Sequence, residues 1–319
     1  MQEKRNTKRK NLCPVLDDSR RAFIKLLLVA GGAVLTDVGG LSYELPVVRA
    51  ADKPPDLLLV KGGDPKALIE TAVKSLGQMS RFVSRGDVVV IKPNIGWDRV
   101  PEQAANTNPE LVGAVVRMCI DAGAKKVKVF DRPCDEPRRC YVQSGIEAAV
   151  KSAGGEIFFM DERKFKEVKI GGQVLKTWPL YTEILDADKV INMPIAKHHS
   201  LTRVTLALKN WMGVMGGNRA LIHQKADQSL ADLTLVIRPA LTILDATRIL
   251  VRNGPSGGSL RDVKKMDTLI AGVDQVAVDS LGASLFGLKG EDLPFLNAAE
   301  KLGQGSIDYR KLNFRTIQL

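Results

Sequence analysis

Aromatic residues, cysteine and long apolar runs are all scarce in this sequence. Phe, Trp and Tyr make up 5% of the 319 residues, and only four residues are cysteine. Val, Leu, Ile and Ala must therefore supply the core. The apolar run from Leu26 to Leu35 is far shorter than the ~20 residues that cross a bilayer as a helix. With 45% apolar and 26% charged residues, the composition excludes a disordered chain, a coiled coil and a collagen-like repeat.

Several motifs are missing as well. No Cys-x-x-Cys pair occurs, so we expect no intrinsic iron–sulfur cluster. Neither Gly-x-Gly-x-x-Gly nor a P-loop sequence occurs, which removes the usual support for dinucleotide or nucleoside triphosphate binding. Cys134 and Cys140 flank a short polar segment and either form a disulfide or stay free. Cys119 lies in an apolar helical stretch and is expected to fill the core.

Residues 1–50 have the pattern of a targeting segment. A basic start leads into Ser19–Lys25, where the paired Arg20 and Arg21 resemble a twin-arginine (Tat) export signal. The apolar run follows, and Val48–Ala50 offers small residues for a signal peptidase. We therefore expect a signal peptide cut after Ala50, the Tat translocase as partner, and a periplasmic or otherwise exported protein. If uncleaved, the signal would anchor the protein to the membrane.

The positive charge of the chain does not indicate a nucleic-acid partner. The formal net charge is +11, and removal of residues 1–50 lowers it to +7, spread along the remaining sequence. No run of basic residues with interleaved aromatics appears, so a nucleic-acid groove is not expected. The charge fits a solvated surface together with a basic pocket.

The rest of the chain alternates short apolar, β-branched runs with helical patterns. Strands are expected at 57–60, 87–91, 126–130, 156–160, 189–193, 241–245 and 267–271, with helices at 64–77, 108–121, 141–153, 201–213, 228–238 and 274–286, and a hairpin at 168–175. This alternation predicts parallel βαβ units. The sequence thus predicts a single α/β domain over residues 51–319, with a mostly parallel sheet, helices on both faces and a small β-hairpin insertion.

Polar residues recur just after the expected strands. They are Lys92, Asn94, Asp131, Asp161, Lys197, His198 and Asp245. In open parallel sheets ligands bind outside the carboxyl ends of the strands, where helix N-termini also point. We therefore expect these residues to converge on one rim. Alternatively, each acid serves only as a helix N-cap or turn former.

All three histidines fall between positions 198 and 223. In an extended segment His198 and His199 point to opposite sides, and we choose His198 as the site residue because it follows Lys197. His198 would act as a general base or, with His223 and Asp131 or Asp245, as a ligand of a divalent metal. A surface position without a role is the alternative.

Two further segments offer ligand contacts. If residues 201–213 are helical, Thr202, Thr205 and Lys209 share one face, and Asn210 follows directly. Gly254 and Gly258 bound a Gly-rich segment whose N–H groups would form an anion-binding nest, or which is simply a flexible connecting loop.

The sequence resembles the family of domain of unknown function 362 over roughly residues 57–305. The matching residues are Ile91–Asn94, Thr107–Val112, Val127–Asp131, Ser144–Ile146, Ile191–Pro194, Lys197, His198, Thr205, Lys209, Asn210, Gly213, His223, Asp245, Gly254, Pro255, Gly258 and Asp274–Asp279. The family is similar in kind to α/β proteins without an assigned reaction, and many members carry or accompany a ferredoxin-like iron–sulfur module. For a redox role the resemblance thus implies a separate iron–sulfur partner or another cofactor, because this chain lacks the cysteine cluster. It also supports Lys92, Asn94, Asp131, Lys197, His198, Lys209, Asn210, His223, Asp245, Asp274 and Asp279 as the polar set.

Two functional hypotheses follow. In the first, lysines 92, 197 and 209 bind an anionic or metal-bound small molecule, with Asn94, Asn210, Gly254 and Gly258 as further ligand contacts. His198, Lys197, Asp131 and Asp245 would be the catalytic groups. In the second, the chain is a non-catalytic cofactor-binding or maturation protein that serves an iron–sulfur system.

Overall fold

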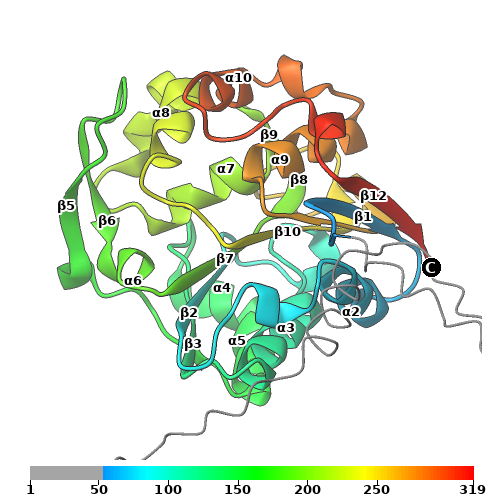
Figure 1. Cartoon of the computed structure of the whole chain (residues 1–319). Helices are drawn as coiled ribbons and strands as arrows, with labels where there is room; N and C mark the ends of the chain where they lie inside the picture. The colour runs from blue at the N-terminus through cyan, green and yellow to red at the C-terminus, as the bar shows by residue number, and fades with distance from the viewer. Residues whose placement is uncertain (1–52) are drawn as a thin grey trace, which may run out of the picture. The chain divides into compact units, whose positions relative to one another are not determined.

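A central β-sheet separates two helical layers in the computed structural model, which describes residues 53–319 (Figure 1). The strand order is β12-β1-β11-β10-β7-β2-β3-β4, and β8 joins β10 while β9 joins β8. The strands are β1 Leu57–Lys61, β2 Val88–Pro93, β3 Lys126–Val129, β4 Glu156–Ile157, β7 Lys189–Met193, β8 Ile195–His199, β9 Arg203–Thr205, β10 Leu241–Leu250, β11 Val263–Gly272 and β12 Phe314–Gln318.

Most neighbouring strands of this sheet run parallel. The pairs β1–β12, β10–β7, β10–β8, β2–β7, β2–β3 and β3–β4 are parallel, whereas β11 is antiparallel to both β1 and β10, and β9 is antiparallel to β8. Parallel neighbours need a crossover connection, which the helices between them supply. The prediction of a mostly parallel α/β sheet is confirmed.

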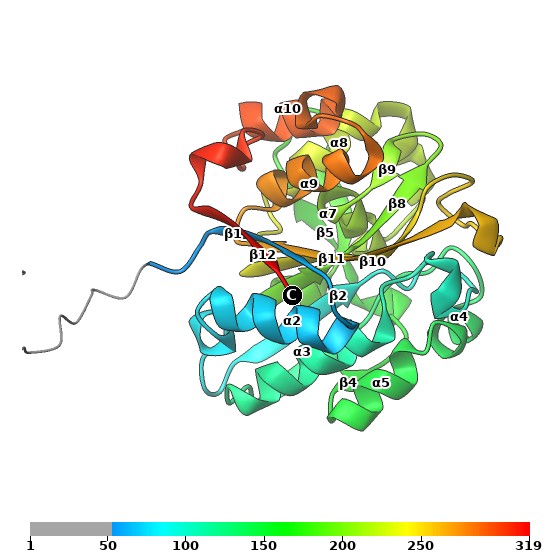
Figure 2. The same cartoon turned by 90° about the vertical axis from the view of Figure 1, so that its right-hand side faces the viewer.

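Helices cover both faces of the sheet (Figures 1 and 2). On one side lie α2 Pro65–Ser75, α3 Pro109–Asp121, α4 Pro137–Gln143 and α5 Ile146–Ala153; on the other lie α7 Ala207–Asn210, α8 Ala226–Leu233, α9 Gln275–Ala283 and α10 Pro294–Lys301. The short helix α6 spans Thr182–Leu185. The 3₁₀ helices are η1 Met79–Arg81, η2 Pro101–Gln103, η3 Glu162–Lys164, η4 Trp211–Val214, η5 Arg219–Lys225, η6 Leu260–Asp262, η7 Ser284–Phe286, η8 Gly290–Asp292 and η9 Tyr309–Lys311.

Strand alternation divides the core into two. In β2, Val89 and Ile91 pack with the side chains of α2, α3 and α5, while Val90 packs into the opposite cluster with Phe130 and Leu244. Successive residues of a strand face opposite sides of the sheet, so a run of Val and Ile buried on both faces is the expected pattern for a covered parallel strand. The end of β2 is therefore held rigidly where its first polar residues follow.

Helix caps follow the sequence signals closely. Asn108 caps α3, with its side chain accepting a hydrogen bond from the backbone N–H of Glu110 and with Pro109 in the first turn. Asp64 caps α2 and Asp274 caps α9 in the same way. Asp279 lies inside α9, and its carboxylate accepts hydrogen bonds from the N–H groups of Ala207 and Leu208, at 2.6 and 2.9 Å, where α7 begins. Asp274 and Asp279 thus have structural roles.

Several predicted elements differ from the observed ones. The helix expected at 141–153 is broken into α4 and α5 at Gly145, whose φ of +71° interrupts the helix. The strand expected at 156–160 keeps only β4. The continuous helix expected at 201–213 is wrong, because β9 occupies Arg203–Thr205 and only α7 and η4 are helical. Thr202 and Thr205 therefore share no helix face with Lys209.

Other features match or settle open alternatives. The hairpin is present as β5 Phe165–Lys169 and β6 Thr177–Tyr181, a separate antiparallel pair. Cys119, Cys134 and Cys140 are all free, so the disulfide alternative is not realised in this structure. Within residues 53–319, no helix has both the length and the apolar character needed to cross a membrane.

Candidate functional site

A cavity of about 340 Å³ opens beyond the carboxyl ends of β2 and β3 and alongside β8. Its wall includes Asn94, Asp131, Lys197, Lys209 and Asn210, and Lys92 lies directly behind Asp131. These six residues come from four places in the sequence. The structure brings together most of the residues that follow the predicted strands.

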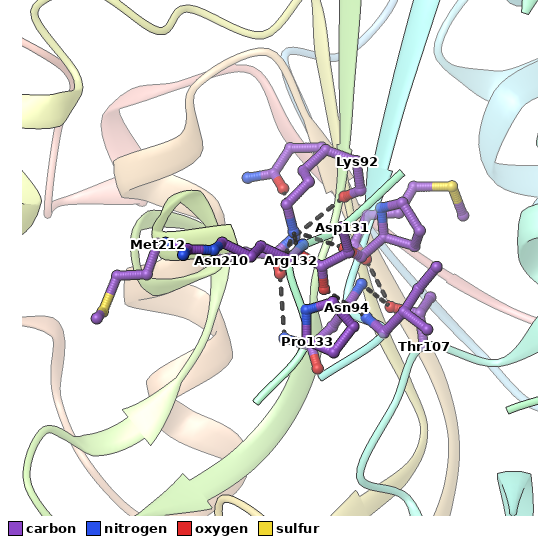
Figure 3. A network of polar contacts seen from close by, with 12 residues as sticks. Lys92, Asn94, Thr107, Asp131, Arg132, Pro133, Asn210 and Met212 are labelled. Carbon is purple, nitrogen blue, oxygen red and sulfur yellow. Dashed lines mark hydrogen bonds and ion pairs between the residues drawn. The ribbon is translucent and has the colours of Figure 1, made fainter. Parts of the chain in front are cut away.

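A buried ion pair forms the base of the site (Figure 3). Lys92 Nζ lies 2.8 Å from Asp131 Oδ1, and the two side chains are 0% and 2% exposed. The same ammonium donates to Pro93 O at 2.7 Å and to Asn210 Oδ1 at 3.2 Å. Asp131 also accepts from the N–H groups of Ile95 and Arg132. The pair joins the ends of β2 and β3 to α7.

The ion pair occupies the space where a side chain at position 213 would lie, and Gly213 has none. A Cβ at Gly213 would lie 1.9 Å from Asp131 Oδ1 and 2.6 Å from Lys92 Nζ. Backbone must therefore pass this point without a side chain, and Gly213 O accepts the N–H of Arg132 at 2.9 Å. The glycine is a steric requirement of the site.

Asn94 connects the ion pair to a second buried lysine. Its Nδ2 donates to Asn210 Oδ1 at 3.1 Å, and its Oδ1 accepts from Lys197 Nζ at 3.1 Å. Lys197 Nζ also donates to Ala105 O at 2.5 Å and lies 6.0 Å from the centre of the Trp97 ring. Lys197 is 1% exposed. Burial lowers the pKa of Lys197 to about 7.

Lys209 and two histidines line another wall. Lys209 Nζ contacts Met212 Sδ at 2.9 Å and His223 Nε2 at 3.1 Å. Since His223 Nδ1 faces Ala220 O at 3.2 Å, the ring carries its proton on Nδ1 and accepts from Lys209 through Nε2. The His199 ring stacks on that of His223 with centroids 5.8 Å apart. Burial lowers the pKa of Lys209 to about 8 and that of His199 to about 3.

Arg219, at the start of η5, adds a further cation. Its guanidinium donates to the carbonyl oxygens of Arg132, Met212 and Pro133 and lies 3.4 Å from Cys134 Sγ. Within residues 53–319, no carboxylate lies within ion-pair distance of Lys197, Lys209 or Arg219. The cavity therefore carries a surplus of positive charge.

One hydroxyl group in the cavity wall has no partner. Thr205, on β9, is 4% exposed, and its buried Oγ1 forms no hydrogen bond with the described residues. An unpartnered buried hydroxyl costs free energy unless a bound group satisfies it. Thr205 thus contributes a buried hydroxyl whose hydrogen-bond capacity the described residues leave unused.

The structure separates His198 from this site. His198 does not line the cavity, and its Nδ1 accepts the N–H of Gly254 at 3.2 Å. Because β8 is extended, the side chain that shares a face with Lys197 is His199, so His198 does not join Lys197 at this cavity and its catalytic role stays a prediction. The predicted metal ligands His198 and His223 therefore face different surroundings. Among the described residues no group of three His, Cys, Asp or Glu is placed to hold a metal.

Asp245 and the glycine segment also lie outside the cavity wall. Asp245 accepts from the N–H of Asn108 and from the N–H and hydroxyl of Thr247, at 2.7 to 2.9 Å. It is not at a strand end, because β10 continues to Leu250. Gly254 packs against His198 O, and Gly258 O accepts from Gln103 Nε2, so Pro255 alone of this segment reaches the cavity. Asp245, Gly254 and Gly258 therefore do not join the other residues as expected, and this cavity gives no support to their predicted catalytic and anion-binding roles.

Sequence reasoning missed His199, Arg219, Trp97 and Cys134. The alternation of β8 contained the signal for His199, since it lies two residues after Lys197. Arg219 lies in a polar segment whose sequence shows neither the periodicity of a strand nor that of a helix. Its position depends on how η5 folds back over the loop after Asp131, which no local pattern indicates.

These features define an α/β protein with a basic pocket at its strand ends. The model of the family "Domain of unknown function (DUF362)" matches residues 89–284. Since that is more than half of the chain, the protein belongs to the DUF362 family, and the resemblance drawn from the sequence is confirmed.

Similar proteins carry little functional information. The chain is 28% identical over 259 residues to the thylakoid-associated protein sll1697 of Synechocystis sp. (strain ATCC 27184 / PCC 6803 / Kazusa), covering 76% of each. A Thermotoga maritima protein has 11% identity and a TM-score of 0.41, over 75% of this chain and 58% of that one. The lactate racemase apoprotein from Thermoanaerobacterium thermosaccharolyticum has 11% identity and a TM-score of 0.37, over 83% and 60%. The chain thus spans less than two thirds of either solved chain, and these likenesses support no statement about function.

The ion pair gives a first prediction. Asp131→Asn removes the carboxylate and leaves Lys92 buried without a counter-charge, so the free energy of unfolding should fall by about 3–5 kcal/mol in urea titrations. Asp161→Asn is the matched control, because Asp161 also follows a predicted strand but pairs with the exposed Arg163. An equally small loss for both variants would show that the Lys92–Asp131 pair contributes no special stability.

Gly213 gives a second prediction. Gly213→Ala forces a methyl group into the ion pair and should lower the free energy of unfolding by about 1–3 kcal/mol. Gly113→Ala on α3 is the control, since the nearest atom to its added Cβ is Ala149 O at 3.3 Å and alanine favours a helix. Thermal unfolding of both variants tests this, and a Gly213→Ala protein as stable as the Gly113→Ala protein would contradict it.

Proposed function

We propose that the cavity binds a small anionic molecule through its carboxylate or phosphate-type group. The observation that supports this proposal is the set of three cations, Lys197, Lys209 and Arg219, gathered around one cavity without a carboxylate partner among the described residues. Cations held close together and away from water are stabilised only by a counter-charge. An anion in the cavity supplies that counter-charge.

The cavity size restricts the ligand class. A volume of about 340 Å³ suits a small molecule, and Arg219 contributes a permanent positive charge to the cavity wall. The alternative hypothesis, a non-catalytic cofactor-binding or maturation protein, uses the same pocket and differs in the absence of turnover. A metal ion is part of the proposal only where the anion brings it already bound.

Sulfate binding tests the proposal directly. Sulfate keeps its charge of −2 at neutral and alkaline pH, so any pH dependence belongs to the protein. Lys197 and Lys209 lose their protons as the pH rises through about 7 and about 8. The affinity for sulfate, measured by calorimetry, should therefore fall about tenfold or more between about pH 6 and pH 9.

Other titrating or charged groups face these two lysines. They are Lys92, Asp131, Cys134, His199, Arg219 and His223.

Lys209→Met should weaken sulfate binding about tenfold, since a charge-assisted hydrogen bond is lost. Lys225→Met is the matched control, because Lys225 lies at the end of η5, is exposed and does not line the cavity. Equal affinities for the two variants, or no sulfate binding at all, would refute the proposal.

We also propose that the protein is exported by the Tat pathway. Residues 1–50 lie outside the described part of the structure, so the support comes from the sequence, together with the thylakoid association in the name of the relative. Changing both Arg20 and Arg21 to Lys should leave the precursor in the cytoplasm, whereas changing Lys4 and Arg5 to Gln should not. Immunoblots of cell fractions report this, and unaltered export of the Arg20/Arg21 variant would rule out the Tat signal.

A further inference from the structure

Two buried lysines of the site have different numbers of hydrogen-bond acceptors. Lys92 Nζ has three oxygen neighbours, Asp131 Oδ1, Asn210 Oδ1 and Pro93 O, at 2.7 to 3.2 Å. An ammonium group has three N–H donors, and each finds one acceptor. One of the three acceptors is a carboxylate, so Lys92 is a charged structural group.

Lys197 Nζ has only two acceptors, and both are neutral. They are Asn94 Oδ1 and Ala105 O. A neutral amine has two N–H donors and one lone pair, so these acceptors satisfy it completely and leave the lone pair for the remaining direction. Lys197 lines the cavity, whereas Lys92 does not. The free valence of Lys197 is therefore available to a molecule in the cavity.

The surroundings of Lys197 favour the neutral amine. Its side chain is 1% exposed, and no carboxylate among the described residues lies within ion-pair distance. Burial is the main cause that lowers the pKa of Lys197; Lys209 and Lys92 lower it further, while Asp131 and Cys134 act in the opposite direction without cancelling the effect of burial. With a pKa of about 7, about half of Lys197 is unprotonated at neutral pH, compared with fewer than about 0.1% for an exposed lysine.

We propose that Lys197 Nζ is a nucleophile that forms an imine with a small anionic aldehyde or 2-oxo acid. The inference rests on the proposed function, because Lys209 and Arg219 bind the anionic group of the same molecule. It adds the substrate class: an anion that also carries a reactive carbonyl. A desolvated lysine beside other cations is the usual setting of amine nucleophiles.

The step balances without a further reactant. The lone pair of Lys197 Nζ attacks the carbonyl carbon, a C–N bond forms, and the carbonyl π electrons move to oxygen. The two amine protons leave nitrogen and, with that oxygen, depart as water while the C=N bond forms. Nothing is oxidised or reduced.

Reductive trapping tests the inference on the intact protein. The chain is incubated at neutral pH with glyoxylate and cyanoborohydride, which reduces an imine to a stable secondary amine, and each lysine is examined by peptide mass spectrometry. Adduct at Lys197 should exceed adduct at the exposed Lys66 by at least about tenfold. Sulfate should suppress the adduct at Lys197 and leave Lys66 unchanged. The uncharged aldehyde glycolaldehyde should label Lys197 at least about tenfold less than glyoxylate does.

Variants and a non-reactive analogue separate the possible failures. Lys197→Arg keeps a cation but removes the nucleophile, so the major adduct should disappear. The wild-type adduct map keeps the test decisive if this variant does not fold. If the wild type binds glycolate or sulfate but labels Lys197 no more than Lys66, the imine is excluded and the anion pocket stands. If no anion binds at all, the proposed function fails as well.

Discussion

The buried contact between Lys92 and Asp131 is the interaction on which the site depends. Two charges in full burial are tolerated only when they pair closely and every remaining donor and acceptor is satisfied. Here the carboxylate also receives the N–H groups of Ile95 and Arg132, and the ammonium reaches Asn210 on α7. The pair thus holds the segments that follow β2 and β3 against the helix layer on the other side of the sheet. The position of the pocket follows from that connection.

Lys197 and Lys209 have no comparable ion pair. Lys197 and Lys209 are both buried, yet neither has a carboxylate partner within the part of the chain described. Keeping such groups in a folded protein costs free energy that apolar residues of similar size would not cost. Sites that violate the ordinary rules of polar satisfaction are where function is expected. The unpartnered Thr205 hydroxyl violates the same rule in the same cavity.

The sequence predicted the sheet well because the signals for β2, β3 and β7 are local. Runs of apolar residues end at Lys92, Asp131 and Pro194, and the capping pattern Asn108-Pro109 predicts the start of α3. The rule that polar residues after strands converge succeeded where a strand truly ends. It failed for Asp245, since β10 runs on to Leu250 and turns the carboxylate toward the backbone of Asn108. It did not identify His199, which shares a face of β8 with Lys197, because the neighbouring His198 was chosen instead. It could not find Arg219 either, because the contacts of Arg219 depend on tertiary folding.

The side-chain amides of Asn94 and Asn210 connect Lys92 to Lys197. Their hydrogen bonds determine which polar groups of the cavity have capacity left for a ligand. Asn94 donates to Asn210 and accepts from Lys197, and Asn210 in turn donates to Asn192 and to Lys92 O. Each amide has one orientation that satisfies all of these contacts, so Asn94 and Asn210 have fixed roles within the protein. Lys197 and Lys209 each keep one hydrogen-bonding position that these protein contacts do not use, and Arg219 adds its charge to the same cavity. The proposed recognition of an anion would therefore rest on these two lysines and on the charge of Arg219, not on the amide network.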